Sequence, residues 1–490
     1  MKINNILKIN NILNIKKWKI RLFPLQTRDY GFILYPDLPS SYLLTLLIDK
    51  LWFHLEQFKI DYVYPFKKYV SNLLLRINND EFNEEYFIFW LENYYHSSDY
   101  ALWFLETVLE TISKKDIRPF VIIHSIKTPK KELEDLINKY DFILLIINWD
   151  LDLFFNDLFF NNIDIKSIWN LLYRDDEWNV MVNDSQSLKW DLNKYVIWAY
   201  DSWYYTYFSK SKDQIISFLD EDNKNTNSDI YYRWPKSKFI EHFRYSTETS
   251  AMITTWRGCK YKCSYCYRWV KYSSVRQISL DTIKRDLDKL EELKYEYIYV
   301  YDDCFLTTNY DRIDNLIDLL SKYTFSYGIS TRYEMCKPEV LIKLKQLNIK
   351  RIQIWLQSIS LEVSKETKRW FNKDNFEKTL KDLDDYWIKV SLDLILWLPW
   401  EWLKWFLKTF NYAIWLKPRS IYINSLFLNP WTELYDKKDE YWIVTLNNNG
   451  MFHVNSVISS NSFTKNDIAL AKKYITYYIN KIKNIEIILR

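Results

Sequence analysis

The sequence contains very little glycine. Only 4 of its 490 residues are Gly, while 23 are Trp. An average usage of about 7% would give about 34 Gly in a chain of this length. Only glycine adopts positive φ without a steric penalty, so an enzyme can hardly build its turns from four glycines. Either the chain has an ordinary Trp-rich core, or many of its Trp residues stand in place of Gly.

Several tryptophans occupy positions where a turn calls for glycine. Trp178 lies in a polar segment between two apolar runs, as a hairpin glycine does, and Trp431 follows the proline of a turn. A gene in which UGA encodes glycine, translated as if UGA encoded tryptophan, explains this pattern. The abundance of Ile, Asn, Lys and Tyr suits the AT-rich genomes in which such reassignments occur. We favour this recoding hypothesis for six positions, which are Trp178, Trp256, Trp355, Trp397, Trp400 and Trp431.

Other features that the sequence lacks exclude several classes of protein. Five Cys exclude a disulfide scaffold and fit a reducing compartment. The near balance of 67 Lys and Arg against 63 Asp and Glu argues against a nucleic-acid partner or a polybasic membrane binder. The most apolar long stretch, residues 141–160, is interrupted by Asp150, Asp152 and Asp157, so we expect no transmembrane segment. No signal-peptide pattern is evident, and we expect a cytoplasmic protein.

The order of apolar runs and amphipathic stretches predicts an α/β protein. In the first half, strand and helix patterns alternate, which is typical of a doubly wound parallel sheet. The second half repeats six strand–helix units, which predicts a (β/α)6 partial TIM barrel. A polar segment between the two halves is the best linker. The predicted parts are an N-terminal extension (1–19), a Rossmann-like domain (20–200), a linker (201–245), the partial barrel (246–440) and a C-terminal extension (441–490).

Three cysteines carry the chemistry. Cys259, Cys263 and Cys266 form a CxxxCxxC pattern directly after the first strand of the second half. Three thiolates on one short loop can bind three corners of a [4Fe–4S] cube and leave the fourth iron open. A structural zinc site would need four ligands, and no fourth Cys or His lies nearby. Cys304 and Cys336 are better explained as small buried residues than as ligands.

With this motif, residues 247–433 resemble the radical S-adenosylmethionine (SAM) superfamily. The segment from Thr254 to Cys259 looks like the start of its cluster loop, and Tyr265 sits where the family has an aromatic that packs on adenine. Asp302 and Asp303 resemble its acidic strand end, which implies a contact with the SAM amino group. Capping of the next helix is the alternative. Arg332 ends the third strand, where the family often has an Arg near the SAM carboxylate or ribose; a surface ion pair is the alternative.

Three further turns resemble the family best if Trp is Gly. Gln357 and Ser358 complete a pattern like G-x-Q-S, which implies a cofactor contact, although these residues could simply satisfy the strand end. Residues 396–401 look like a G-L-P-G-E turn and residues 429–434 like N-P-G-T-E-L. Tyr267 and Arg268 could line the substrate side of the cluster loop. The agreement of these turns supports the recoding hypothesis.

The first half resembles the cobalamin-binding-like domain that precedes the barrel in one branch of the superfamily. Residues 141–150 look like its strand before a Gly-Glu-Gly turn, and residues 167–179 like its closing hairpin. A histidine in a D-x-H-x-x-G motif is missing, because none of the five His has that context. Those five are His54, His96, His124, His242 and His453. The resemblance thus implies cobalamin bound without a protein imidazole, or a domain that has lost it.

The leading hypothesis is a radical SAM enzyme that reductively cleaves SAM at a [4Fe–4S] cluster to start radical chemistry. With cobalamin, methyl transfer becomes possible; without it, rearrangement, oxidation or cyclisation are open. The expected partners are a small-molecule or lipid-like substrate and an electron donor such as flavodoxin or ferredoxin. One alternative is a radical SAM RNA modifier, but no Cys precedes Cys259, as the methylthiotransferase kind would require. The other is a non-catalytic Fe–S or zinc module, which the match over six strand ends disfavours.

Overall fold

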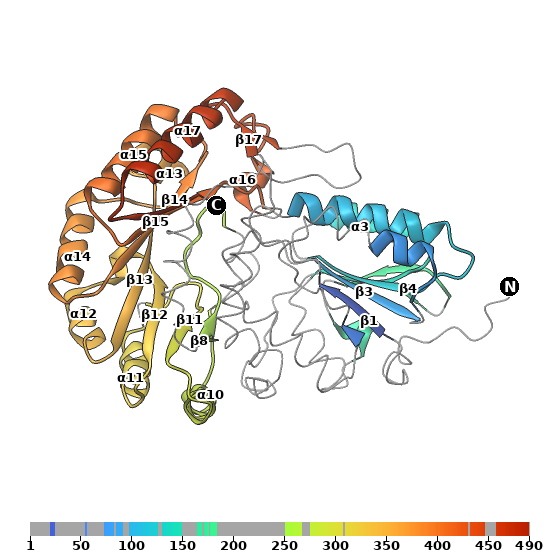
Figure 1. The fold of residues 1–490 in the computed structure, drawn as a ribbon, viewed down its shortest axis with the longest axis horizontal. Coiled ribbons are helices and arrows are strands. Elements are labelled where there is room, and N and C mark those ends of the chain that lie inside the picture. The colour runs from blue at the N-terminus through green and yellow to red at the C-terminus, as the bar shows by residue number, and fades with distance from the viewer. Residues whose placement is uncertain are drawn as a thin grey trace. The chain divides into compact units, whose positions relative to one another are not determined.

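The chain forms two compact units in a computed structural model (Figure 1). One unit holds the described residues up to 183 and the other those from 250 onward. The predicted extension 1–19, the linker 201–245, Tyr267, Arg268 and Trp431 lie outside the described residues. The structure describes residues 20–24, 54–55, 73–82, 85–91, 98–125, 130–148, 164–168, 171–175, 177–183, 250–266, 275–306, 309–429, 432–445 and 457–489.

The first unit contains a mostly parallel sheet in the strand order β2-β1-β3-β4-β5-β6-β7. The first five strands pair in parallel and the last two pair antiparallel. The order 2-1-3-4-5 of the parallel strands is that of doubly wound nucleotide-binding sheets, so the Rossmann-like prediction is confirmed at the level of fold. The strands are β1 (Ile20–Pro24), β2 (His54–Leu55), β3 (Tyr86–Leu91), β4 (Phe120–Ser125), β5 (Ile143–Ile147), β6 (Leu171–Arg174) and β7 (Val180–Val182).

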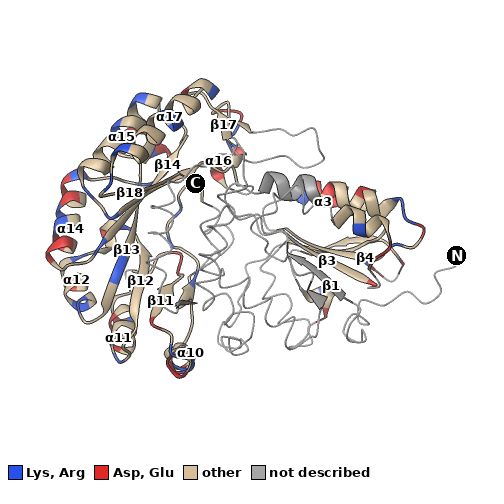
Figure 2. Ribbon diagram, viewed as in Figure 1, with Lys and Arg blue, Asp and Glu red and all other residues tan. Residues whose placement is uncertain are grey.

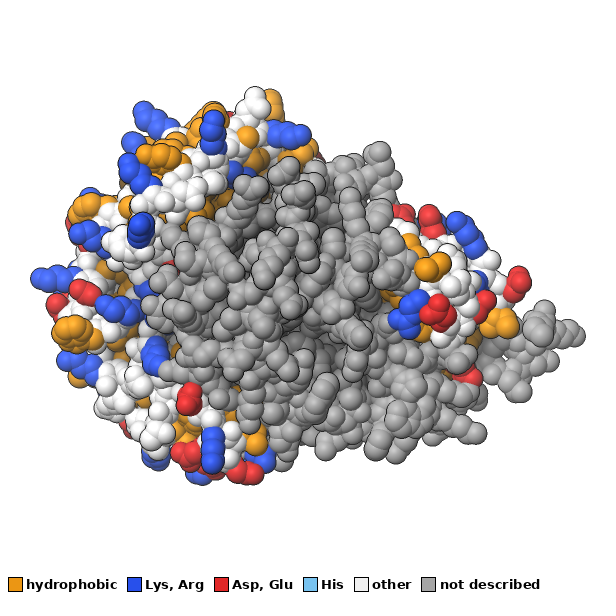
Figure 3. Space-filling model, viewed as in Figure 1, with side chains coloured by type: hydrophobic (Ala, Val, Ile, Leu, Met, Phe, Trp, Pro, Cys, Tyr) orange, Lys and Arg blue, Asp and Glu red, His pale blue; other side chains and the backbone are white. Residues whose placement is uncertain are grey.

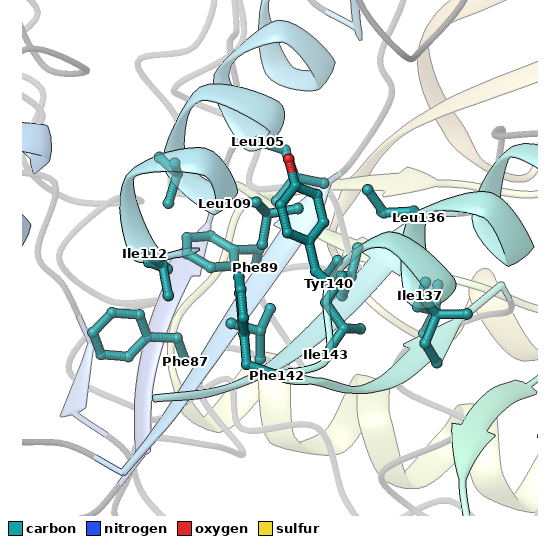
Figure 4. Close-up of a cluster of buried hydrophobic side chains, with 14 of the residues drawn as sticks. Phe87, Phe89, Leu105, Leu109, Ile112, Leu136, Ile137, Tyr140, Phe142 and Ile143 are labelled. Carbon is teal, nitrogen blue, oxygen red and sulfur yellow. The ribbon is translucent and has the colours of Figure 1, made fainter. Parts of the chain in front are cut away.

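The core of this unit lies between the sheet and the helices α3 (Ser98–Ser113) and α4 (Lys130–Lys139). Figure 4 shows Leu105 and Leu109 of α3 close to Phe89 of β3. All five residues of β5 are buried, as expected for a strand covered on both faces. Reactive side chains are therefore expected in the loops of the first unit or in the second unit.

The barrel unit contains a seven-stranded parallel sheet in the order β18-β15-β14-β13-β12-β11-β8. The six predicted strands are present, and β18, at the end of the chain, pairs with β15 as a seventh. The sheet curves without closing, which confirms the partial barrel. Its strands are β8 (Ser250–Ile253), β11 (Tyr297–Val300), β12 (Ser326–Thr331), β13 (Asn348–Gln357), β14 (Val390–Leu396), β15 (Ser420–Ser425) and β18 (Glu486–Leu489).

Helices cover the outer side of this sheet, and their charged residues face outward (Figure 2). On the described surface, hydrophobic side chains are interspersed with charged ones (Figure 3). No described helix is long and apolar enough to cross a membrane. The helices are α10 (Leu280–Glu292), α11 (Tyr310–Leu320), α12 (Pro338–Leu344), α13 (Leu361–Glu366), α14 (Lys373–Asp385), α15 (Leu403–Trp415), α16 (Glu433–Asp436) and α17 (Lys465–Lys481).

The two faces of the barrel sheet differ in polarity. On β13, Ile352 and Ile354 are fully buried toward the helices, while Gln353 alternates with them and is half-buried. A hydrogen-bonded chain runs across the opposite, inner face. Tyr299 contacts Ser330 and Gln353 through its hydroxyl, and Gln353 donates to Asp393 over 2.6 Å. The inner face of the barrel is therefore polar, from β11 to β14.

Tryptophan is over-represented at positive φ. Among the described residues, ten non-glycine residues have positive φ, and five of them are Trp. Trp387 has φ 61° directly after α14 and is 84% exposed; its N–H and that of Ile388 bond back to the last turn of the helix. Helix ends of this type usually carry glycine. The five are Trp178, Trp387, Trp397, Trp400 and Trp442.

These backbone angles bear on the recoding hypothesis position by position. Trp178 lies in the predicted tight turn with φ 71°, although its ring is half-buried and lies 6.1 Å from that of Phe120. Trp397 and Trp400 also take the predicted glycine-like conformation. Trp256 and Trp355 do not have positive φ, so the backbone gives no support there. Trp387 and Trp442 are additional candidates that the sequence pattern did not reveal.

Candidate active site

The cysteine loop leaves the barrel sheet directly after β8. Two short strands, β9 (Trp256–Arg257) and β10 (Arg276–Gln277), pair antiparallel and close the base of the loop. Gly258, with φ 100°, turns the chain from β9 toward Cys259. The carboxyl ends of barrel strands carry the active site in this kind of fold, and the loop sits at that end.

Two segments distant in sequence hold the cysteine loop in place. The N–H of Ser264 donates to Thr367 O over 3.2 Å, just after α13, and Ser264 O accepts from Leu434 N over 2.9 Å. Within the loop, Cys266 N donates to Cys263 O over 3.0 Å and forms a turn. The backbone between the second and third cysteines is thus fixed from both sides.

Asp302 and Asp303 hold the base of the loop. Asp302 is 5% exposed, and its carboxylate accepts from the backbone N–H groups of Thr255 and Trp256 and from the Thr255 hydroxyl. Burial raises the pKa of Asp302 to about 7, although these hydrogen bonds oppose the shift. Asp303 accepts from Gly258 N over 2.9 Å. The following helix, α11, is capped by Asn309, so the alternative that these acids cap it is wrong.

Arg332 lies buried beside the cysteine loop. Its guanidinium is 3.9 Å from the Sγ of Cys263, lies over the ring of Tyr261 and makes two hydrogen bonds to Glu334. Burial acts to lower the pKa of Arg332, but the hydrogen bonds and charge of Glu334 raise it above its ordinary value. The residue is 4% exposed, so a surface ion pair is the wrong description. It provides a permanent positive charge next to the cysteines.

The three thiols differ in their surroundings. Cys263 is buried, while Cys259 and Cys266 are half-buried. Burial raises the pKa of Cys259, and the nearby Cys304 adds to the shift. Within the described residues, no three His, Cys, Asp or Glu side chains converge closely enough to hold a metal ion. In a [4Fe–4S] cube each cysteine binds a different iron, so the three thiols of this loop do not need to converge on one ion.

Gln357 and Ser358 form a strained turn at the end of β13. Gln357 has φ 65°, and Ser358 N donates to Leu356 O over 2.9 Å, which closes a γ-turn with positive φ. The Ser358 hydroxyl donates to Glu401, so it does not point freely toward a ligand. Gln357 is 8% exposed and its Oε1 has no partner among the described residues. Of the two, Gln357 is the one with a free acceptor.

The sequence interpretation missed three residues of this region. Arg369 is buried and donates to Trp355 O, which ties the segment after α13 to the end of β13. Tyr261 lies under the guanidinium of Arg332. Glu401 is completely buried and bonds Ser358. Only Glu401 had a signal, as the last residue of the G-L-P-G-E-like turn.

Several buried polar atoms without partners lie at the carboxyl ends of the barrel strands. Such atoms are rare in folded proteins, and each calls for an explanation such as a ligand or water. Of the sixteen such atoms in the described ranges, six lie at this end of the barrel, which are Tyr261 OH, Gln357 Oε1, Trp397 Nε1, Glu401 Oε2, Asn424 Oδ1 and Asn429 Oδ1. They come from the cysteine loop and from the ends of β13, β14 and β15. The set fits a polar cofactor such as SAM, which offers donors and acceptors at this end of the barrel.

The donor set also fits an iron–sulfur cluster. Three thiols on one anchored loop match the requirement for a cube with one open iron. Arg332 places a positive charge near Cys263, and a positive charge there would stabilise the negative charge of a thiolate-bound cluster. The residues present therefore fit both groups.

Comparison with known proteins bears on the family and the fold of this part of the chain. Residues 253–413 match the Radical SAM superfamily. No curated protein matches the sequence. The structure resembles the radical SAM methyltransferase TsrM from Kitasatospora setae with cobalamin and a [4Fe–4S] cluster bound, at TM-score 0.55 and 12% identity, over 87% of this chain and 75% of that one.

A second solved structure is similar over nearly the whole chain. The cobalamin-dependent SAM radical enzyme OxsB, with aqua-cobalamin and SAM bound, matches at TM-score 0.57 and 15% identity. The match covers 94% of this chain and 66% of OxsB, so the chain spans slightly less than two thirds of that protein. At these identities the likeness shows the fold of both units. Together with the family match, it identifies residues 253–413 as a domain of the radical SAM superfamily.

Proposed function

We propose that Cys259, Cys263 and Cys266 hold a [4Fe–4S] cluster at which SAM is reductively cleaved. Bound there and reduced by an electron-donor protein, such a cluster would supply the one electron that cleavage of the C5′–S bond of SAM to methionine and a 5′-deoxyadenosyl radical requires, and that radical would abstract a hydrogen atom from the substrate. The observation that carries this proposal is the cysteine loop anchored at the carboxyl end of β8, with Arg332 beside it.

The residues around the loop have distinct proposed tasks. Asp302 and Asp303 fix the backbone at its base, and Arg332 keeps a positive charge near the sulfur of Cys263. Tyr265 is half-buried and is proposed to pack on the adenine of SAM. Gln357 is proposed to receive a hydrogen bond from SAM through its free Oε1.

The inner face of the barrel favours a polar substrate over a lipid-like one. Tyr299, Ser330, Gln353 and Asp393 present hydroxyl, amide and carboxylate groups along one face. An acyl chain placed against these groups would form no hydrogen bonds with them and would remove polar surface from water. We therefore propose a small molecule with several hydrogen-bonding groups as the substrate class.

Cobalamin-dependent methyl transfer is a second candidate function. It is favoured because the likeness to TsrM and OxsB extends over both units of this chain. His124 lies buried at the end of β4, without the D-x-H-x-x-G context. Any corrinoid is therefore proposed to bind through the loops after the parallel strands, with no protein imidazole on cobalt.

Anaerobic reconstitution with iron and sulfide tests the leading function. The protein should bind about four iron atoms and turn brown, and added SAM should alter the EPR spectrum of the reduced cluster because it occupies the open iron. Zinc in place of iron, or a cluster that SAM does not perturb, would instead indicate a non-catalytic module.

A further inference from the structure

Glu401 occupies an unusual environment for a carboxyl group. It is completely buried in the turn between β14 and α15, and none of its hydrogen-bond partners is a cation. Its Oε1 accepts from the Ser358 hydroxyl, and its Oε2 has no partner within the described part of the chain. Carboxyl groups are rarely buried without a partner of opposite charge, so this arrangement requires a reason.

The second neighbour of Glu401 contributes little to it. The Thr409 hydroxyl lies 3.4 Å from Oε1 but only 3.0 Å from Trp405 O, and it has a single hydrogen to donate. The same hydroxyl accepts from Ile359 N over 3.3 Å. Ser358 is therefore the main partner of the Glu401 carboxyl, and the bond joins the ends of two neighbouring strands.

The residue attached to Glu401 belongs to the strained turn. Ser358 directly follows Gln357, whose φ of 65° is uncommon for any residue with a long side chain. Such conformations persist only when the surroundings fix them. Here Ser358 bonds Glu401, Ile359 bonds Thr409, and Ser360 N donates to Ser358 Oγ over 3.1 Å. Hydrogen bonds thus fix each of the three residues that follow Gln357.

We propose that Glu401 is a positioning residue that, through Ser358, holds the turn at Gln357 so that its side chain meets bound SAM. The free Oε1 of Gln357, which is more than nine-tenths buried, is the acceptor that the turn presents. This inference rests on the proposed function for the identity of the ligand. The contact by which Glu401 and Ser358 hold the turn does not depend on which ligand is bound.

The protonation state follows from the same geometry. Burial raises the pKa of Glu401 to about 8, while its bonds with Ser358 and Thr409 oppose the shift. No charged group from the packed elements contributes to this pKa. A neutral acid and a neutral amide make similar hydrogen bonds, so Glu401→Gln should retain the function that Glu401→Ala loses.

SAM binding to the cluster-loaded protein is measured by equilibrium dialysis. Glu401→Ala and Ser358→Ala should each weaken SAM binding by about tenfold with unchanged iron content, and Glu401→Gln should bind SAM like the unaltered protein. Glu377→Gln, an acid on α14 bonded to Tyr412, is the matched control and should have no effect. Unchanged SAM affinity in both alanine variants would overturn the proposal. If Glu401→Ala does not fold, Ser358→Ala decides alone.

Amide hydrogen exchange separates this inference from the proposed function. In peptides covering residues 355–362, Ser358→Ala should accelerate exchange, whereas Glu377→Gln should not. If the unaltered protein binds no SAM, the proposed function fails, and the exchange result still decides whether Glu401 holds the turn. Exchange in Ser358→Ala equal to that of the unaltered protein would refute the hold.

Discussion

The two seven-stranded sheets of this chain differ in what their strands carry. In the first unit, β5 is apolar and buried throughout, and its neighbour β4 is nearly so. In the barrel, Gln353 and Asp393 alternate with buried aliphatic residues and form a polar inner face. A sheet buried on both faces can place chemistry only in its loops, whereas a barrel can place it on strands as well. The difference favours the barrel as the place of the proposed reactive site.

The largest effect is expected from the cysteine loop, which has no counterpart in the first unit. Replacing Cys259, Cys263 or Cys266 by Ala should abolish cluster binding and SAM cleavage, because three ligands are the minimum for a cube with one open iron. Iron content and 5′-deoxyadenosine yield measure both losses.

The other two cysteines are the controls for that series. Cys304→Ala and Cys336→Ala remove buried thiols outside the CxxxCxxC motif and should retain cluster and cleavage. If any one of the three loop variants keeps full iron and full 5′-deoxyadenosine yield, the cluster assignment is wrong.

The second prediction is that folding stability depends on pH through Glu401 of the barrel unit. The folded-state pKa of Glu401 is raised from 4.5 to about 8, so its proton is held more tightly in the folded state. Its stabilising contribution is complete below about pH 4.5 and is lost as the pH rises through about 8. Within that window the free energy of unfolding should fall by up to about 1.4 kcal/mol per pH unit from this group.

Urea unfolding of the Glu401→Gln variant measures how much Glu401 contributes to the pH dependence of the unfolding free energy. The amide does not ionise, so the unfolding free energy of the variant should depend less on pH between about 5 and 8 than that of the unaltered protein. Glu377→Gln should keep the original slope. Equal slopes in all three proteins would show that Glu401 is ionised in the folded state.

A smaller effect is expected at the tryptophans with positive φ. Trp387 is exposed and lies in a left-handed conformation after α14, so Trp387→Gly should stabilise the chain by about 1 kcal/mol. Trp370 is similarly exposed but does not have positive φ, so Trp370→Gly should give no such gain. The comparison is made by urea unfolding, and a loss of stability in Trp387→Gly would contradict it.

The recoding hypothesis has a direct chemical test. Peptide mass spectrometry on protein from the source cell should show Gly at Trp387, Trp397, Trp400 and Trp442, each with the mass difference between the two residues. Trp at all four positions would refute the hypothesis and leave the glycine-like backbone there unexplained.

The smallest expected signal belongs to the first unit. If the protein binds a corrinoid, the EPR spectrum of its Co(II) form should lack nitrogen superhyperfine coupling from a protein imidazole, because no D-x-H-x-x-G motif is present. Such coupling would contradict this expectation. Failure to bind any corrinoid after reconstitution would favour a domain that has lost its cofactor.

Local patterns in the sequence were sufficient to predict six of the seven strands of the barrel sheet and to single out the cysteine loop. The repeated strand–helix units of the second half predict the parallel barrel strands, and the spacing of the cysteines predicts a cluster loop. The hold of Glu401 on Ser358 joins residues 43 positions apart, and β18 pairs with β15 from the end of the chain. These long-range contacts depend on tertiary packing, which local patterns do not encode.

The roles of individual residues could not be predicted from the sequence for the same reason. Asp302 and Ser358 were expected to contact SAM, but their polar groups are bonded to Thr255 and Glu401. Gln357 was named for the same role, and its buried, free Oε1 agrees with it. Whether a polar side chain is available to a ligand depends on neighbours that are distant in sequence.

The most direct test of the central claim is SAM cleavage by the reconstituted protein. Incubation with SAM and dithionite under anaerobic conditions should yield 5′-deoxyadenosine and methionine in equal amounts. The variant with all three cysteines Cys259, Cys263 and Cys266 replaced by Ala should yield neither. A brown, fully loaded protein that leaves SAM intact, or cleavage that persists without the three cysteines, would contradict the account.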